Sequence, residues 1–253
     1  MNSVLSTLRV LEEVAVRQPI GVSDLARATQ IPKSTVQRCL VTLQEAGWLR
    51  VVDPEHARWG VTMKALAIGL RGAGDQDLRQ LAAPVIKRLA AETDETVHLG
   101  LRDGTDSVIV AREDSTQIVR VFLEIGTRLP LRVTSVGIAI MARLDSREVD
   151  DLLKLEVGDL ELESLGDAPI PSRDDLRKEV AATAERGYSV NGSSWFRPHV
   201  ATIGAAIMDP ADRPIAGLAL SIPEMRYDQS KESDLARITV EAAAEITQLI
   251  RSS

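Results

Sequence analysis

The sequence has 253 residues, of which 44% are hydrophobic, enough to form a hydrophobic core in one small and one medium-sized domain. It contains no apolar run of about eighteen residues, so no transmembrane helix and no membrane partner are expected, and Glu12 and Glu13 interrupt the first apolar stretch, which argues against a signal peptide. The only cysteine, Cys39, excludes an intramolecular disulfide and a thiolate cluster for a metal, and a reducing cytoplasm is the expected location.

The net charge of −7 is unevenly distributed along the chain. Residues 1–74 carry nine Lys or Arg against six Asp or Glu, whereas the remaining residues carry twenty-one against thirty-one. A slightly basic N-terminal part on an acidic body indicates a small DNA-binding domain joined to a second, sensing domain.

The first predicted helix covers residues 2–17. Four of its apolar residues recur at helical spacing and are expected to face inward: Val4, Leu8, Leu11 and Ala15. A short second helix follows Gly21, and a third helix begins near Pro32 and ends at Gly47, a natural residue after a helix C-terminus.

The third helix carries two different faces. Its inward residues are Val36, Leu40 and Leu43. Its polar residues cluster in the first two turns: Lys33, Ser34, Thr35, Gln37 and Arg38. Ser, Thr, Lys and Arg contact phosphates, and Gln or Arg pairs with purine edges, so this is the pattern of a helix-turn-helix whose third helix reads double-stranded DNA.

Two short predicted strands, 48–52 and 58–61, flank a polar turn at residues 53–56. They form a β-hairpin wing, in which Arg58 is expected to contact backbone phosphate. The alternative is a plain three-helix bundle whose polar face is only solvated, and Cys39 is expected to be a small core residue.

Residues 62–77 are predicted to form a linker helix that ends at Gly72, and we divide the chain into a DNA-binding domain (1–61), this linker, and a larger domain (78–253). The larger domain is predicted to be α+β with a mainly antiparallel sheet. Its first expected helix begins at Leu78, and Pro84 lies either near the effective start of this helix or at a kink in it. Further helices are expected at 135–143, 146–155 and 173–184 and from Leu235 to Leu249. Its expected strands are 97–101 and 107–112 in a hairpin, a β-rich segment at 118–123, and 200–208 and 214–222, with 126–130 as a loop.

The segment PKSTVQRCLVTLQEAGWL (32–49) resembles the N-terminal domain of the IclR family of bacterial regulators. The stretches ETVHLGLRDG (95–104), VRVFLEIGTRLPLRVTSVGIAIMA (119–142), ERGYSV (185–190) and PIAGLALSIP (214–223) resemble the effector domain of the same family, which is related to GAF domains. The resemblance implies a winged helix-turn-helix, a linker helix and an effector-binding domain. The chain departs from the family pattern at Trp59 and Thr62 in the wing exit, and between Tyr188 and Ala205.

The resemblance also implies a pocket for a small effector between the sheet and the loop that leads into the helix at 135. One side would be lined by Ile118, Val121, Leu129, Ser135 and Val136. The other side would be lined by Asn191, Thr202, Ala219 and Ser221. Most of this lining is aliphatic, so we expect a moderately apolar or aromatic small molecule, with the backbone amides near Gly137 as a place for an anion. The alternative is that these residues pack a core without a pocket.

We therefore expect a sequence-specific DNA-binding transcriptional regulator, either repressor or activator, that binds its operator as a homodimer or homotetramer and responds to a small molecule. One alternative is a regulator whose second domain only mediates oligomerisation. A second alternative is an enzyme fused to a DNA-binding domain. However, His56 lies in the wing, His98 in a strand and His199 before a strand, and no catalytic or metal-binding motif is present. We expect neither catalysis nor a metal or cofactor.

Overall fold

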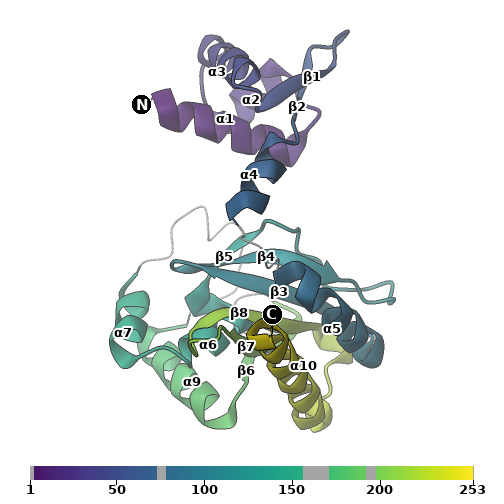
Figure 1. The fold of residues 1–253 in the computed structure, drawn as a ribbon, viewed down its shortest axis with the longest axis vertical. Helices are drawn as coiled ribbons and strands as arrows, with labels where there is room; N and C mark the ends of the chain where they lie inside the picture. The colour runs from purple at the N-terminus through teal and green to yellow at the C-terminus, as the bar shows by residue number, and fades with distance from the viewer. Residues whose placement is uncertain (1–2, 73–77, 156–170, 192–197, 253) are drawn as a thin grey trace. The chain divides into compact units, whose positions relative to one another are not determined.

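The computed structural model describes residues 3–72, 78–155, 171–191 and 198–252. The chain divides into two compact units, Met1–Asp77 and Leu78–Ser253. Figure 1 shows a helical unit with a small hairpin and a second unit built on a larger sheet.

The N-terminal unit follows the order helix, helix, helix, hairpin, helix. Its elements are α1 (Ser3–Arg17), α2 (Val22–Thr29), α3 (Lys33–Glu45), β1 (Leu49–Asp53), β2 (Arg58–Val61) and α4 (Lys64–Gly72). Gly21 is the N-cap of α2, and Gly47 adopts φ +76° directly after α3, the left-handed conformation in which a side chain is strained. The predicted elements of this unit are confirmed, and helix α3 begins directly after Pro32, its N-cap residue.

The core of this unit is formed by residues from all three first helices and both strands. Val36, Leu40 and Leu43 of α3 are buried as predicted, together with Cys39. Antiparallel pairing joins Leu49 to Val61 and Val51 to Trp59, and a bridge from Ile20 to Trp59 fastens the hairpin to the turn before α2.

The predicted inward face of α1 is wrong for Val4, Leu8 and Ala15, which are exposed, whereas Leu11 is partly buried against the core. Val4 and Leu8 are 62% and 47% exposed, and the buried residues are Ser6, Val10 and Val14. Helix α1 is apolar on more than one side, so periodicity alone admits two orientations, and packing against α2, α3 and β2 selects the one that buries the valines.

The C-terminal unit contains one six-stranded antiparallel sheet in the order β5-β4-β3-β8-β7-β6. Its strands are β3 (Thr96–Asp103), β4 (Asp106–Glu113), β5 (Arg128–Pro130), β6 (Ser189–Asn191), β7 (Val200–Met208) and β8 (Pro214–Pro223). Its α-helices, among the described residues, are α5 (Leu78–Thr93), α6 (Ser135–Met141), α7 (Ser146–Lys154), α9 (Arg173–Arg186) and α10 (Glu232–Ser252). The α+β prediction is confirmed.

The two faces of this sheet have different chemistry because successive strand residues point to opposite sides. Val97, Leu99, Leu218 and Leu220 belong to the main core together with buried residues of α5 and α10. The alternate residues lie on the face that packs against α6, whose own core continues into α7 and α9. That second face carries polar and small side chains.

Helix α6 lies directly on the sheet because one strand residue there is glycine. A Cβ on Gly204 would lie 2.6 Å from the carbonyl carbon and oxygen of Ser135. No other residue type fits at this crossing without moving the helix.

Two predictions for this unit need correction. Residues 118–123 form no strand, and two of their carbonyl oxygens, those of Val119 and Leu123, accept hydrogen bonds from the side chains of Arg226 and Arg112. The predicted loop at 126–130 contains the short strand β5, which pairs with β4. Of the two predicted placements of Pro84, the structure has the one inside the helix, within α5. Within the described residues, no helix is both long and apolar enough to span a bilayer.

Candidate DNA-binding face and effector site

Helix α3 presents the predicted DNA-contacting residues to solvent. Lys33, Ser34, Gln37 and Arg38 are exposed, and Thr35 is half-buried. Within the described residues, neither Lys33 nor Arg38 takes part in an ion pair. Two cations free to meet phosphate or a base edge therefore lie in the first two turns, while the opposite face of the helix is held in the core.

The tip of the wing is less basic than the two strands that flank it. At its tip, the backbone amide of His56 donates to Asp53 Oδ1 at 3.2 Å, and this hydrogen bond, with the ring contact, lowers the pKa of the Asp53 carboxyl. Arg58 is half-buried and its Nη1 donates to the carbonyl oxygen of Pro19 at 3.3 Å. Among the described residues this contact engages one guanidinium donor, which leaves other donors of Arg58 for phosphate. Sequence reasoning did not single out Arg50, which is exposed on the neighbouring strand.

The wing exit is tied to the end of the recognition helix. Thr62 Oγ1 donates to the carbonyl oxygen of Gly47 at 2.7 Å, and Lys64 Nζ donates to that of Ala46 at 2.6 Å. Lys64 Nζ also lies 5.2 Å from the ring centroid of Trp48. These contacts use the carbonyls that a helix C-terminus leaves open, and they join the start of α4 to α3.

In the larger unit, the sheet register brings three of the predicted effector residues into one row. Asn191 pairs with Thr202, Thr202 pairs with Ser221, and Ser221 pairs with Thr96. Asn191, Ser221 and Thr96 are buried. We call Asn191, Thr202, Ser221 and Thr96 the polar row.

Two side-chain oxygen atoms of the polar row have no hydrogen-bond partner among the described residues. Asn191 Nδ2 donates to the carbonyl oxygen of Val133 at 3.3 Å, but among the described residues its Oδ1 has no hydrogen-bond partner, and neither does Thr202 Oγ1. His98 is 1% exposed, and its Nδ1 lies 3.0 Å from Ser221 Oγ. Buried polar atoms without partners are costly, so this row is a candidate for contact with a polar group of a ligand.

The predicted lining also includes apolar residues, of which Ala219 lies on the same face of β8 as Ser221. Leu129, Val136, Ala219 and Val121 are all buried, and Ser135 is buried at the start of α6, where its carbonyl oxygen accepts from Ser189 Oγ at 2.6 Å. By contrast, Ile118 is 96% exposed and does not join the buried set.

The backbone amide of Gly137 donates to Thr134 Oγ1 at 2.9 Å, so the N-cap of α6 already uses the amide that we expected to be open to an anion. Among the described residues, no group of His, Cys, Asp and Glu side chains has a metal-binding arrangement. Sequence reasoning missed Thr96 in the row and treated His98 as ordinary strand structure, because only the register reveals their neighbours.

A helix-turn-helix with a hairpin wing, followed by a sheet domain with a buried polar row, defines a DNA-binding regulator with a sensing domain. Residues 3–53 match the IclR helix-turn-helix domain, and residues 72–248 match the bacterial transcriptional regulator IclR C-terminal domain. The chain belongs to the IclR family of transcriptional regulators.

Individual relatives agree along nearly the whole chain. The HTH-type transcriptional regulator KipR of Bacillus subtilis is 28% identical over 249 residues, which cover 98% of this chain and 97% of that protein. The transcriptional repressor IclR of Escherichia coli is 26% identical over 250 residues, with 98% and 89% covered. An IclR homologue of Microbacterium hydrocarbonoxydans, crystallised with 4-hydroxybenzoate, shares the fold with a TM-score of 0.80 at 21% identity over 100% of both chains. The two family models make this chain a transcriptional regulator rather than an enzyme, with a DNA-binding helix-turn-helix domain and an effector-binding IclR C-terminal domain.

Proposed function

We propose that this regulator binds a double-stranded operator as a homodimer or homotetramer in the cytoplasm, with residues 1–61 as the DNA-binding domain, 62–77 as the linker and 78–253 as the effector domain. The proposed contact residues are Lys33, Ser34, Thr35, Gln37, Arg38 and Arg58. The observation that carries this assignment is the exposed polar face of α3, with two cations that have no ion-pair partner among the described residues. Two-fold symmetry of the oligomer would match two operator half-sites.

We further propose that the effector is a moderately apolar or aromatic small molecule that carries a hydrogen-bond donor. Asn191 Oδ1 accepts but cannot donate, so a ligand hydroxyl or N–H group would satisfy it, and Thr202 and Ser221 can bind either kind of group. The apolar part of the ligand would contact Val121, Leu129, Val136 and Ala219, with Ile118 and Ser135 at the margin. The 4-hydroxybenzoate bound by the Microbacterium homologue has an aromatic ring and a hydroxyl, and it supports this chemical class.

The test has two stages. Genomic fragments that the full-length protein retains are selected first, which identifies the operator. The operator affinity is then measured with a panel of hydroxylated aromatic acids and a panel of short dicarboxylates. We expect an aromatic compound to change the affinity, because an effector acts only through different affinities for the DNA-bound and DNA-free states. A response only to short hydrophilic acids would overturn the proposed class, and no response to any compound would favour a domain that only mediates oligomerisation.

A further inference from the structure

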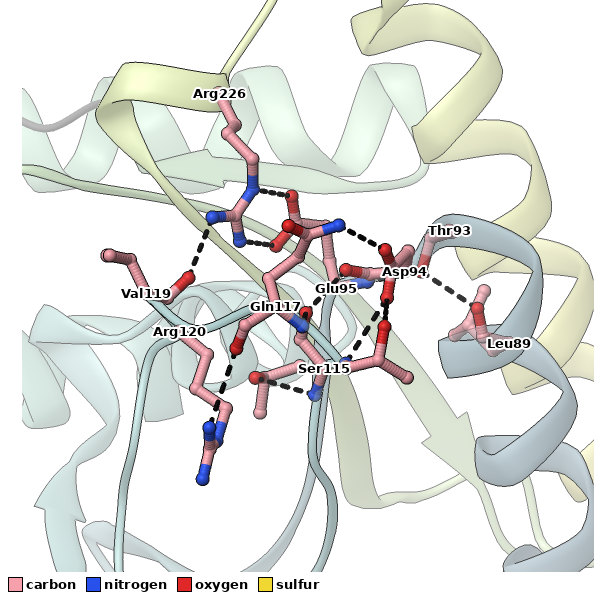
Figure 2. A network of polar contacts seen from close by, with 11 residues as sticks. Leu89, Thr93, Asp94, Glu95, Ser115, Gln117, Val119, Arg120 and Arg226 are labelled. Atoms are coloured by element: carbon pink, nitrogen blue, oxygen red, sulfur yellow. Dashed lines mark hydrogen bonds and ion pairs between the residues drawn. The ribbon is translucent and has the colours of Figure 1, made fainter.

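Residues 115–123, which we call the wall segment, follow β4 and contain neither helix nor strand. Side chains anchor the start of this segment, as Figure 2 shows. Asp94 Oδ1 accepts from the backbone amide of Thr116 at 3.2 Å and from its hydroxyl at 2.7 Å, and Asp94 Oδ2 accepts from Gln117 Nε2. Ser115 Oγ donates to the carbonyl oxygen of Asp94 at 2.6 Å.

Arg226 anchors the middle of the wall segment. Its Nε and Nη2 donate to the two carboxylate oxygens of Glu95 at 2.8 Å and 2.7 Å, and its Nη1 donates to the carbonyl oxygen of Val119 at 2.7 Å. The side chain of Glu95 is 10% exposed and that of Arg226 is 25% exposed. The pair is therefore partly shielded from water and its geometry is bidentate, the arrangement in which an arginine–carboxylate pair is strong and directional.

The two anchoring residues belong to the strands that carry the polar row. Glu95 directly precedes Thr96 in β3, and Arg226 follows β8, the strand of Ser221. The carbonyl that Arg226 holds belongs to Val119, two residues before Val121, which is buried and is a proposed effector residue. The ion pair thus links the ends of β3 and β8, the strands of Thr96 and Ser221, to the segment that carries Val121.

We propose that Arg226, oriented by Glu95, is a positioning residue of the effector site, which fixes the wall segment relative to the polar row. This inference rests on the proposed effector site. Arginine suits the role because its planar group makes three contacts in fixed directions, whereas the single ammonium of lysine cannot form the fork and reach the Val119 carbonyl with the same geometry.

The test uses full-length protein with the variants Arg226→Lys and Glu95→Gln. Arg237→Lys is the matched control, since Arg237 forms an exposed ion pair with Glu241 on α10 away from the wall segment. The first measurement is amide hydrogen exchange of residues 115–123 without ligand. We expect exchange to be roughly ten-fold faster in Arg226→Lys, less so in Glu95→Gln, and unchanged in the control.

The second measurement compares the dissociation constant for 4-hydroxybenzoate with the operator affinity in the absence of ligand. A positioning role predicts a dissociation constant raised about ten-fold in Arg226→Lys, with operator affinity unchanged. A merely structural role would weaken the binding of 4-hydroxybenzoate and of the operator together. Unaltered exchange in the wall segment, or altered exchange with unaltered 4-hydroxybenzoate binding, overturns the proposal.

If the unmodified protein does not bind 4-hydroxybenzoate, that result counts against the proposed effector class. The positioning role is then tested by the exchange measurement alone. Faster exchange confined to residues 115–123 supports this role, and faster exchange spread through β3 and β8 overturns it.

Discussion

The recognition helix and the polar row use similar side chains in opposite environments. On α3, Ser34, Gln37 and Arg38 are exposed, while in the sheet Asn191 and Ser221 are almost completely buried. DNA is a polyanion that stays largely solvated when it binds an exposed surface, so binding to α3 depends on charge and on salt concentration. A small molecule has to replace water and satisfy buried polar atoms, so binding in the sheet depends on geometry. Substitutions on α3 should therefore change binding without changing stability, and substitutions around the row should change both.

The largest effect is expected at the crossing of α6 and the sheet. Gly204→Val places a branched side chain where a Cβ alone would lie 2.6 Å from the Ser135 backbone, so α6 has to move. We expect a loss of about 3 kcal/mol or more in the free energy of unfolding, measured by urea denaturation. Gly69→Ala in α4 is the control, because a Cβ there meets nothing within 4 Å. Equal stability of the two variants would contradict the close packing.

Arg38→Ala tests the DNA side of the comparison. We expect the preferred operator to lose about 1–3 kcal/mol of binding free energy, with a smaller loss on random DNA, if the guanidinium reads a base edge. The unfolding free energy should change by less than about 0.5 kcal/mol, because the side chain is exposed. Gel-shift titrations on both DNA types and a thermal melt measure these quantities, and equal losses on both DNA types would mark Arg38 as a phosphate contact.

Lys33→Ala should have a smaller and less selective effect. Removal of one phosphate contact should weaken binding to every sequence and reduce the slope of log affinity against log salt by about one. Affinity measured across a range of salt concentrations checks this. A slope equal to that of the unmodified protein would show that Lys33 does not contact phosphate.

The smallest effect concerns pH. Hydrogen bonds from Thr116 and Gln117, and then the positive charge of Arg226, lower the pKa of Asp94 below its usual 3.8. A carboxyl whose pKa is lower in the folded state stabilises that state above its usual pKa and loses this contribution as the pH falls through the lowered value. We expect residues 115–117 to lose exchange protection below about pH 3.8, and Asp94→Asn to remove this pH dependence. Protection that falls identically in Asp94→Asn would assign the effect to another group.

Local sequence was sufficient for most elements and for the DNA-binding face. Gly21 and Gly47 mark helix boundaries through backbone preferences that depend on one residue, and the polar and apolar sides of α3 follow from its own period. The strands at 200–208 and 214–222 were predicted as apolar runs bounded by turn residues, which is also a local signal.

The buried face of α1 and the conformation of residues 118–123 depended on partners distant in the sequence. Helix α1 has apolar residues on both candidate faces, and only contact with α2, α3 and β2 chooses between them. The segment 118–123 has the composition of a strand, but Arg226, more than a hundred residues later, binds one of its carbonyls. Propensity cannot include a hydrogen-bond partner of this kind.

The sequence by itself determined the two-domain organisation, the helix-turn-helix and the antiparallel sheet class, because these follow from periods and turn residues within short windows. The family resemblance grouped Asn191, Thr202 and Ser221, but only the tertiary structure placed them in one row and added Thr96 and His98. Asn191, Thr202, Ser221, Thr96 and His98 come from four strands, and their proximity is a matter of register, which long-range pairing sets and a local pattern does not record.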